Sequence, residues 1–394
     1  MPSPRPKRRA EKLRALQRRK MAESAHAYVR GNTRSFYEWL DSSAAILPQG
    51  PPIWICGDCH VGNLGPLADR KGRVAVQIRD LDQTVIGNPA HDIVRLGLSL
   101  ASLARGSDLP GLTTLEILEE LLAGYRRGLL RPTSTEDDRT HRSRTIQALL
   151  SHSLKRGWRD LAEERIDDTH PSIPLGKRFW ALSSEERAAL TKLVDTEAVR
   201  RLVTRVRHRD DDAPIRMVDA AYWVKGCSSL GRLRYAVLIG VGDKDADGHC
   251  LIDIKQAVRA AAPHAPQDMP ANQADRVVAG ALALSPSLGE RMLSARLLGR
   301  AVVLRELAPQ DLKPDIGQMS RAESVRITGY FASVLGRAHG RQLGERERRA
   351  WSRALARYRT RGSAPSWLWD ATVELLALHE AAYLDHCRAL ALQR

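Results

Sequence analysis

The stretch 54-WICGDCHVGN-63 carries two kinds of group that could do chemistry. Cys56 and Cys59 fit the C-x-x-C-H pattern, which can attach haem, bind a metal or cycle as a disulfide. Asp58 and Asn63 instead offer a carboxylate and an amide oxygen, five residues apart. The cysteines predict haem, zinc or redox chemistry, whereas the oxygen-bearing side chains predict a site for a hard cation.

Each use of the cysteine pair lacks residues that it would need elsewhere in the chain. Haem attachment normally requires export, and the basic segment 1–20 is not followed by the apolar run of a secretory signal. A zinc site takes about four nitrogen or sulfur ligands, and no second C-x-x-C or His pair has a matching spacing. A redox pair should open a helix, for which Gly57 and Gly62 are poor residues. These uses are therefore the less favoured alternatives, and we expect reduced thiols.

A second group of acidic residues supports the cation site. Asp80 and Asp82 come directly after the apolar run 73-RVAVQI-78, and the run 53-IWIC-56 likewise ends just before the first loop. If the two runs form adjacent strands, their ends bring these carboxylates close to the polar residues of that loop. Carboxylate and amide oxygens suit Mg²⁺. A catalytic Asp, a nearby Asn and a separate metal-binding Asp are the layout used for phosphoryl transfer by protein kinases.

The segment 57-GDCHVGN-63 resembles the G-D-x-H-x-x-N loop of aminoglycoside phosphotransferases and choline-kinase-like enzymes. The segment 80-DLDQTVIGNPAHDIVRL-96 is similar to the metal-binding segment that follows this loop in those enzymes. The resemblance implies that Asp58 is the catalytic residue. It also implies metal ligands and supporting residues, namely Asn63, Asp80 and Asp82 for the metal, and His60 and Asp92 for the loop.

Several of these residues also have an ordinary structural interpretation. Asp92 precedes a helical pattern that begins at Ile93, and we expect it to cap that helix. Asp82 fits a solvated turn residue, and Asp58 with Asn63 fits an Asx-rich turn. His60 is expected to support the loop by hydrogen bonding rather than to bind a metal.

The parts of a phosphotransferase that bind the nucleotide are found downstream of this loop. The stretch 224-VKGCSSLGRLRYAVLI-239 predicts a strand, a glycine-containing turn and a second strand, and its small residues allow backbone amides to approach phosphate. Lys255 lies in the apolar run 251-LIDIKQA-257, like the lysine of the V-A-I-K segment of kinases. The segment 303-VLREL-307 is a candidate hinge strand for adenine. The candidate nucleotide-binding residues are Gly226, Ser228, Ser229, Gly231, Lys255, Glu290, Arg305, Glu306 and Leu307.

Kinases pair this lysine with a glutamate on a helix. We expect residues 272–299 to be helical, and Glu290 is the candidate partner within them. Two structural alternatives remain open. Lys255 fits a surface residue at the end of a strand, and the turn between Gly226 and Gly231 fits an ordinary hairpin, because a match to G-x-x-x-x-G alone is weak.

The order of these parts is rotated relative to that of a kinase, because the catalytic loop precedes the glycine-rich turn. The fold expected is therefore α+β, a protein-kinase-like two-lobe fold in circularly permuted order, which chains tolerate when the cut lies in an exposed loop. The predicted segments are a basic N-terminal arm (1–20), a first part of the helical catalytic lobe (21–215), a β-rich nucleotide-binding lobe (216–308) and C-terminal helices that complete the catalytic lobe (309–394).

The whole chain also resembles a bacterial family, the domain-of-unknown-function family 2252, in its G-D-x-H-x-x-N loop, its Asp-x-Asp segment and its later glycine turn with a following lysine. The stretch 28-YVRG-31 is similar to an Arg-Gly element of that family, and Arg30 is a candidate contact for a substrate or anion. The family name implies no activity, so the functional prediction depends on the kinase-like motifs.

The formal net charge of +16 favours an anionic partner such as a nucleotide, a nucleic acid, an acidic protein or a membrane surface, although a solvated basic surface explains it equally well. No apolar run has the length of a spanning helix, which together with the absence of a signal predicts a cytoplasmic location. The function expected is transfer of phosphate from ATP, with Mg²⁺, to a hydroxyl of a small molecule. The alternatives are a catalytically weak, nucleotide-sensing pseudokinase and a basic nucleic-acid-binding protein.

Overall fold

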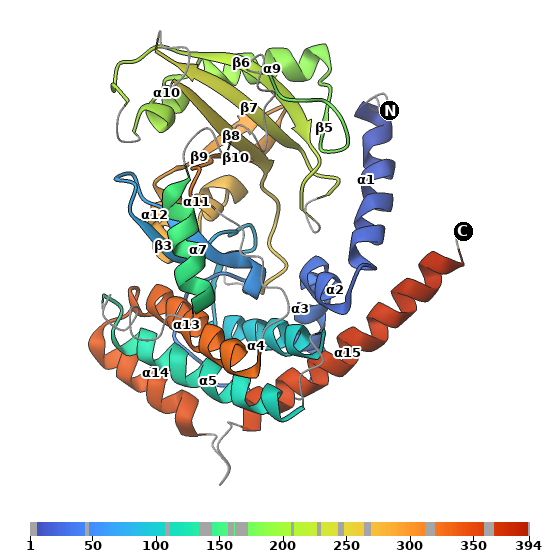
Figure 1. Cartoon of the computed structure of the whole chain (residues 1–394), viewed down its shortest axis with the longest axis vertical. Coiled ribbons are helices and arrows are strands. Elements are labelled where there is room, and N and C mark those ends of the chain that lie inside the picture. The colour runs from blue at the N-terminus through green and yellow to red at the C-terminus, as the bar shows by residue number, and fades with distance from the viewer. Residues whose placement is uncertain are drawn as a thin grey trace.

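The computed structural model describes the chain over residues 6–43, 47–106, 111–133, 144–156, 161, 172–205, 209–226, 230–242, 248–263, 269–311, 320–357 and 366–392. Within these ranges it contains 13 α-helices and three sheets, all of them antiparallel. The predicted α+β class is confirmed. Figure 1 shows the largest sheet in the upper half and most of the long helices in the lower half.

The upper half is built on a six-stranded sheet with the order β5-β6-β7-β8-β10-β9. Along β10, Val302 and Leu304 join the core that includes Leu190 and Val199, whereas Val303 packs with Val277 on the opposite face. This alternation is the one expected of a strand covered on both faces. The strands are β5 (Phe179–Trp180), β6 (Ile215–Trp223), β7 (Arg234–Val241), β8 (His249–Gln256), β9 (Met292–Leu297) and β10 (Arg300–Glu306).

Helices from three parts of the chain cover this sheet. One face packs against α9 (Ser184–Val194), α10 (Glu197–Thr204) and α1 (Pro6–Met21), and the other against α11 (Gln273–Leu284), which is followed by the short α12 (Pro286–Gly289). The upper half therefore includes α1, β5, α9 and α10, which precede residue 216, because their apolar side chains are buried against the strands.

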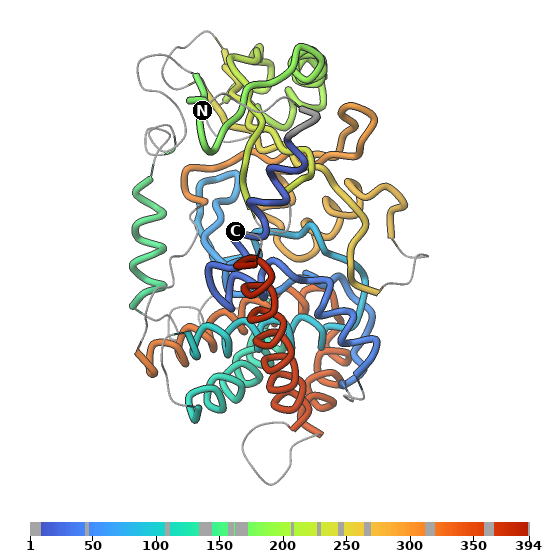
Figure 2. Tube along the Cα trace, turned by 90° about the vertical axis from the view of Figure 1, so that its right-hand side faces the viewer, coloured from blue at the N-terminus to red at the C-terminus, as the bar shows by residue number. Residues whose placement is uncertain are grey.

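The N-terminal helix α1 joins the two halves of the molecule. Leu13 is buried in the core of the sheet, and Arg9 pairs with Glu186 at 2.6 Å. At the other end of α1, the backbone carbonyls of Arg18 and Ala22 accept hydrogen bonds from helix α15 (Ser366–Ala391). Figure 2 shows α1 running down from the sheet to the region where α15 ends. The arm expected over residues 1–20 is thus a packed helix from Pro6 onward.

The lower half is a bundle of helices in which α5 and α13 make the closest approach. A Cβ atom at Gly124 or Gly128 would collide with the backbone of Gly329 or Ser333, so these glycines allow the two helices to touch through their main chains. The helices of this half are α2 (Ala25–Gly31), α3 (Thr33–Ser42), α4 (Pro89–Gly106), α5 (Gly111–Leu130), α7 (Arg144–Lys155), α13 (Arg321–Gly340), α14 (Glu345–Arg357) and α15.

Two small two-stranded sheets lie between the halves, and they correct the predicted strand pairing. The runs expected to pair with each other instead pair with strands that were not predicted: β1 (Ile53–Ile55) with β4 (Val85–Gly87), and β3 (Val74–Ile78) with β2 (Leu64–Ala68). The β2–β3 hairpin forms locally because the carboxylate of Asp69 accepts hydrogen bonds from the backbone of its own turn. Pro66 inside β2 had obscured the strand in the sequence.

Residues 272–299 were expected to be helical with a Ser-Pro-Ser interruption; the interruption is present at Ser285, but the last part is not helical. Helix α11 ends at Leu284 and α12 at Gly289, and residues 292–297 form the edge strand β9. The segment 292-MLSARL-297 has no β-branched residue, so propensity alone did not indicate a strand. Residues 292–297 form a strand because they pair with β10 in a hairpin. Leu297 pairs with Arg300, and the turn between them consists of the positive-φ residues Leu298 and Gly299.

Candidate functional site

The loop between β1 and β2 is fixed by one buried carboxylate from α4. Asp92 accepts hydrogen bonds from the backbone amides of Cys56 at 2.7 Å and Gly57 at 2.9 Å. Its Oδ2 also lies 3.2 Å from Nε2 of His339 on α13. Two segments distant in sequence are thereby joined to the loop that was expected to be catalytic.

The predicted capping role of Asp92 is wrong. The helix begins at Pro89, one turn earlier than expected. The side-chain oxygen of Asn88 accepts a hydrogen bond from the backbone amide of Ala90. Proline is favoured in the first turn of a helix because its missing N–H would have no partner there. Asp92 therefore lies inside the first turn, where a negative charge is stabilised by the helix dipole.

Asp58 is buried and paired with Arg95, a residue that the sequence analysis did not select. Arg95 donates from Nε at 3.1 Å and from Nη2 at 3.0 Å, and both hydrogen bonds end on Oδ1 of Asp58. Burial raises the pKa of Asp58, and the charge of Arg95 lowers it in part, so that the net direction is upward. Arg95 lies one helical turn after Asp92, and this spacing was the available signal that both face the loop.

Asn63 and Asp80 come together beside this pair through the β2–β3 hairpin. The backbone carbonyl of Asn63 accepts a hydrogen bond from the amide of Arg79 at 2.7 Å, which places the two ends of the hairpin in contact. The side-chain Nδ2 of Asn63 donates to the backbone carbonyl of Asp58 at 2.9 Å. Its carbonyl oxygen Oδ1 is thus the atom left to act as a ligand, and Asn63 and Asp80 both line the central cleft.

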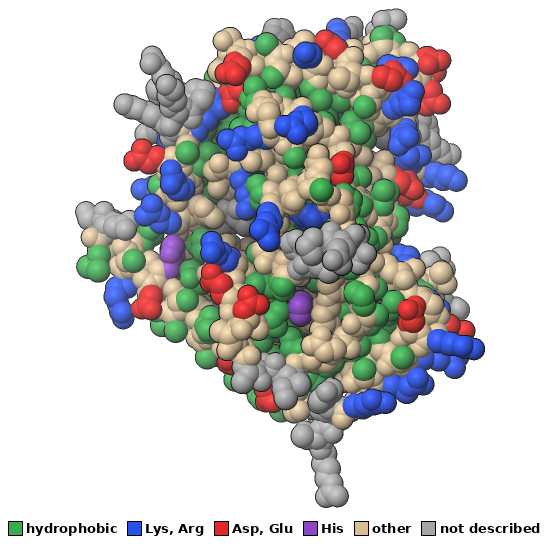
Figure 3. All heavy atoms as spheres, turned by 180° about the vertical axis from the view of Figure 1, so that it is seen from behind, with side chains coloured by type: hydrophobic (Ala, Val, Ile, Leu, Met, Phe, Trp, Pro, Cys, Tyr) green, Lys and Arg blue, Asp and Glu red, His purple; other side chains and the backbone are tan. Residues whose placement is uncertain are grey.

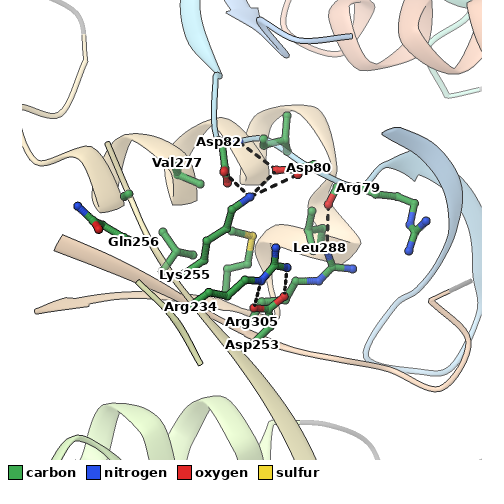
Figure 4. A pocket seen from close by; sticks show the side chains of 14 residues that line it. Arg79, Asp80, Asp82, Arg234, Asp253, Lys255, Gln256, Val277, Leu288 and Arg305 are labelled. Carbon is green, nitrogen blue, oxygen red and sulfur yellow. Dashed lines mark hydrogen bonds and ion pairs between the residues drawn. The ribbon is translucent and has the colours of Figure 1, made fainter. Parts of the chain in front are cut away.

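Lys255 reaches from β8 to the segment after β3 and lies between two carboxylates (Figure 4). Its Nζ is 3.4 Å from both oxygens of Asp80 and also forms an ion pair with Asp82. Desolvation raises the pKa of Asp80, but the charges of Lys255 and Arg234, together with hydrogen bonds from Asp82, lower it, and the net direction is downward. Burial and the neighbouring Asp80 raise the pKa of Asp82. Three predicted site residues, Asp80, Asp82 and Lys255, thus lie together, and the ammonium group of the lysine contacts both carboxylates.

Further charged pairs that the sequence analysis missed surround this cluster. Arg234 binds the carboxylate of Asp253 with Nε at 2.9 Å and Nη2 at 2.5 Å, on the sheet face that also carries Lys255. Arg305, proposed for the hinge, donates to the carbonyl of Arg79 at 2.9 Å and to the carboxylate of Asp311 at 2.9 Å. These contacts connect the sheet to the hairpin that carries Asp80.

The backbone amides of the candidate hinge, residues 306 and 307, donate hydrogen bonds to other parts of the protein. The amide of Glu306 donates to the carbonyl of Arg291 at 3.1 Å, and the amide of Leu307 donates to Leu251 at 2.9 Å. The carboxylate of Glu306 pairs with Arg209 at 2.7 Å. Leu307 lines the cleft beside Ala308 and Pro309, so an adenine at this edge would meet apolar surface rather than unoccupied amides of residues 306 and 307.

The glycine-rich turn is described only at its two ends. Gly226 and Gly231 have φ angles of 90° and 94°, a backbone conformation that glycine adopts readily. The carbonyl of Gly226 accepts a hydrogen bond from Nζ of Lys20 at 3.1 Å, so α1 reaches this turn. Ser228 and Ser229 lie outside the described residues.

Glu290 does not meet Lys255. Its carboxylate pairs with Arg70 at 3.4 Å on the surface. Helix α11, which lies nearer to the lysine, instead carries the buried Arg276. The guanidinium of Arg276 donates to the backbone carbonyls of Thr84, Asp82 and Val258. The predicted lysine–glutamate pair is thus replaced by pairs between Lys255 and the hairpin acids.

Arg30 lies against the loop of Asp58 because Gly62 leaves room for it. A Cβ atom at Gly62 would come within 3.2 Å of Nε and Cζ of Arg30 and of Cε1 of His60. His60 is 5% exposed, and burial lowers its pKa well below the usual value, with Arg30 and Arg95 lowering it further. His60 therefore carries a neutral ring within the loop.

Cys56 and Cys59 are free and buried under this loop. The neighbouring Cys59 and burial raise the pKa of the Cys56 thiol well above its usual value, so Cys56 stays protonated. The hydrogen bond with Cys56 lowers the pKa of Cys59, but burial together with the charges of Asp92 and Asp58 raises it, and the net direction is upward. Both side chains fill space in the core.

A cleft of about 590 Å³ lies between the sheet and the helices, and Arg30, Gly62, Asn63, Asp80 and Arg305 are among the residues that line it. Its Lys and Arg residues come from both halves of the chain: Lys20, Arg30, Arg79, Arg156, Arg178, Lys225, Arg234 and Arg305. On the surface seen in Figure 3, Lys and Arg side chains are mixed with acidic and apolar ones, and a row of them follows the lower right edge. The basic charge is therefore spread over the surface as well as gathered in the cleft.

The donor set of the cleft fits Mg²⁺ in a particular way. Among the described residues, no group of three or more His, Cys, Asp or Glu side chains is placed to hold a metal ion. Mg²⁺ commonly takes only one or two protein ligands and completes its shell with water and substrate phosphates. Asn63 and Asp80 both line the cleft and match that requirement, and Lys255 pairs with the carboxylates of both Asp80 and Asp82.

Among the described helices, none has the length and apolar character needed to cross a membrane. Comparison with curated proteins and with solved structures gives no match. The model of one protein family, described as uncharacterized proteins conserved in bacteria, matches residues 9–389. Because this match covers nearly the whole chain, the protein belongs to that bacterial family, the domain-of-unknown-function family 2252.

Proposed function

We propose that the protein is a phosphotransferase that uses ATP and Mg²⁺, with a kinase-like arrangement in circularly permuted order. The observation that carries the proposal is the convergence of Lys255 on Asp80, beside the loop of Asp58 and Asn63. The sheet supports it as well. Strands β6, β7 and β8 follow one another, with glycines between the first two, Lys255 on the third and a helix after it. Protein kinases place their glycine-rich loop, lysine and glutamate helix in this order.

In this proposal the nucleotide phosphates lie between Lys255 and the turn bounded by Gly226 and Gly231. In this proposal the phosphates replace Asp80 as the ion-pair partner of Lys255. The carboxylate of Asp80 can then act, with Asn63, as a metal ligand. Asn63 and Asp80 would hold Mg²⁺, which would supply charge neutralisation for the phosphates. Lys255 supports the same phosphates from the sheet side of the cleft.

Asp58 orients the hydroxyl of the acceptor. Both hydrogen bonds from Arg95 end on Oδ1, and the proposal assigns Oδ2 to accept the proton of the hydroxyl. A bond forms between the acceptor oxygen and the γ-phosphorus as the bond to the bridging oxygen breaks. ADP leaves, and the proton passes through Asp58 to solvent. Catalysis of this type consists mainly of positioning and charge neutralisation.

The experiment is a measurement of the melting temperature with ATP, with and without Mg²⁺, for the unmodified protein and for Asp80→Ala. A ligand that binds the native state raises the melting temperature. We expect a Mg²⁺-dependent increase that Asp80→Ala removes and that Asp385→Ala, an exposed change on α15, retains. The absence of any Mg²⁺-dependent increase in the unmodified protein would overturn the proposal.

A nucleotide sensor without catalysis is a second candidate, and it is favoured because no helix glutamate in the described part of the chain pairs with Lys255. The two candidates differ in turnover. The phosphotransferase releases ADP in an Asp58-dependent manner, with water as the slowest acceptor. A sensor binds Mg–ATP equally well in the unmodified protein and in Asp58→Asn and releases no ADP above background in either.

Binding of nucleic acid is a third candidate, and the surface of α14 favours it. Arg346, Arg349, Arg353 and Arg357 are all exposed and recur at helical spacing along one side, and Figure 3 shows basic side chains along this edge of the molecule. Binding through phosphates weakens steeply with salt. If this candidate holds, changing Arg346 and Arg353 to Gln reduces the salt slope of RNA or DNA binding by about two. An unchanged slope eliminates it.

A further inference from the structure

The cleft contains more positive charge than its own acids neutralise. Eight Lys and Arg residues line it, against three Asp residues. Each of those acids already has a basic partner: Asp80 is paired with Lys255, Asp253 with Arg234, and Asp311 with Arg291 and Arg305. Phosphates of a nucleotide bound near Lys255 would engage the basic groups around them. Lys20 and Arg30 also line the cleft and stand outside these pairs.

Part of that remaining charge lies on the side of the cleft formed by α1, α2 and the loop of Asp58. Lys20 lies in the last turn of α1 and Arg30 in the last turn of α2, and both line the cleft together with Gly62 and Asn63 of the loop. Lys20 donates to the carbonyl of Gly226, so its ammonium lies at the mouth of the glycine-rich turn. Arg30 lies against the loop itself. An acceptor whose hydroxyl meets Asp58 would therefore place its other end near Arg30.

Arg30 and His60 both carry a buried nitrogen that lacks a hydrogen-bond partner in the described part of the chain. These are Nε of Arg30 and Nδ1 of His60. Both side chains approach the same face of Gly62. A buried polar atom without a partner is costly, and a ligand or water bound at this face of Gly62 would satisfy both atoms. A guanidinium group pairs best with the planar or tetrahedral oxygens of a carboxylate or phosphate.

We infer that the acceptor is an anionic alcohol, a small molecule that carries a phosphate or carboxylate group besides the hydroxyl, and that Arg30 binds this anionic group. The inference rests on the proposed function, since it assigns the acceptor part of the same cleft. His60 supplies a neutral hydrogen-bonding partner at its Nδ1. Arg30 is a specificity residue here and takes no part in the transfer of the phosphoryl group.

The test measures binding of three small probes by calorimetry: glycerol 3-phosphate, glycerate and glycerol. Each is titrated into the protein alone and into the protein with Mg²⁺ and a non-hydrolysable ATP analogue. We expect glycerol 3-phosphate, glycerate or both to bind, and glycerol not to bind. The comparison of the two anions identifies whether phosphate or carboxylate is preferred. Binding of glycerol as tight as that of both anions would overturn the inference, as would the failure of every probe to bind.

Variants separate Arg30 from general attraction to a basic cleft. Arg30→Gln should weaken binding of the anionic probe by about tenfold or more, the loss of one charge-assisted contact, and leave binding of the nucleotide analogue unchanged. Arg34→Gln, an exposed arginine one turn further along the chain, should change neither. Arg30→Lys keeps the charge without the forked geometry and should bind with intermediate affinity, which also guards against misfolding of the Gln variant.

The outcomes distinguish this inference from the proposed function. If the nucleotide analogue binds but the anions bind equally to Arg30→Gln, the inference fails and the proposed function stands. If the anions bind in an Arg30-dependent manner but no nucleotide binds, the proposed function fails and Arg30 marks an anion site of another kind.

Discussion

Arg95 donates two hydrogen bonds to a single carboxylate oxygen of Asp58, from Nε at 3.1 Å and from Nη2 at 3.0 Å. The arginine is 1% exposed, and Nη2 also donates to the carbonyl of Val29 at 2.6 Å. The pair thus joins α2, the loop after β1 and α4 at one buried point. A carboxylate held on one oxygen is fixed in orientation, which is what a residue that positions a hydroxyl requires.

Replacement of Arg95 by Met should destabilise the protein by about 3–5 kcal/mol, because it leaves the buried Asp58 without its counterion. Urea denaturation measures this change. Arg105→Met is the matched control on the same helix, since Arg105 is half exposed and its pair with Glu380 is a surface contact worth about 0–1 kcal/mol. Equal effects of the two substitutions would contradict the role given to Arg95.

Replacement of Lys255 by Met should weaken binding of Mg–ATP and strengthen binding of a divalent cation alone. It removes the proposed phosphate contact, so the increase in melting temperature with Mg–ATP is lost and ADP release falls by about 100-fold or more. It also removes the ammonium group that neutralises Asp80 and Asp82. The two carboxylates then repel each other, and a divalent cation relieves the repulsion.

The second effect is the sharper test of the geometry. Lys255→Met should gain a stabilisation by Mg²⁺ or Mn²⁺ alone that the unmodified protein lacks, as measured by the melting temperature without nucleotide. Lys192→Met, an exposed change on α9, serves as the control. A Lys255→Met protein that responds to metal no more than this control would show that the two acids do not form a site.

The residues of the loop were predictable because their arrangement is local. Asp58 and Asn63 are five residues apart, and the hydrogen bond from Asn63 to the Asp58 carbonyl is made within the same loop. Asp80 follows at the end of a short hairpin. Lys255 was identified by its position on an apolar strand next to a glycine turn. Its contact with Asp82 spans much more of the chain, and the sequence pattern indicated a common site without indicating that pair.

The contacts that were missed depend on packing between distant segments. Arg95 and Arg276 are buried arginines inside helical patterns, where a charged residue ordinarily indicates a solvated face. Glu290 was selected by its place in the sequence alone, and it became a surface residue because the helix ends at Gly289. Partners of this kind follow from the angle at which helices meet the hairpins, which spacing along one chain does not encode.

Gly128 offers a test of the bundle that is independent of any ligand. In an exposed helix, Gly→Ala stabilises by about 1 kcal/mol through the lower entropy of the unfolded chain. A Cβ at Gly128 would instead collide with the carbonyl of Ser333 on α13. We expect Gly128→Ala to destabilise by about 1–3 kcal/mol, as overpacking does. Gly111→Ala, with open space at the start of the same helix, should not destabilise. The same sign for both substitutions in urea denaturation would contradict this packing.

Asp311 should control part of the stability at acid pH. Burial by itself raises the pKa of Asp311, but the charges of Arg291 and Arg305 outweigh it and lower the pKa to about 2. Because this value lies below the ordinary 3.8, the carboxylate's contribution to the free energy of unfolding is complete above about pH 4. It is lost as the pH falls towards 2. The difference between the two pKa values corresponds to about 2 kcal/mol.

Asp311→Asn should therefore be less stable than the unmodified protein by at least about 2 kcal/mol at pH 7, and the difference should narrow below pH 4. Urea denaturation at pH 7, 5 and 3 measures it. All other carboxylates titrate alike in both proteins, so the change in the difference reports Asp311 alone. Asp385→Asn, whose side chain is exposed, should show no such trend. A difference that stays constant from pH 7 to pH 3 would mean that Asp311 does not titrate with a lowered pKa, and that its pairs with the two arginines are not held in the folded protein.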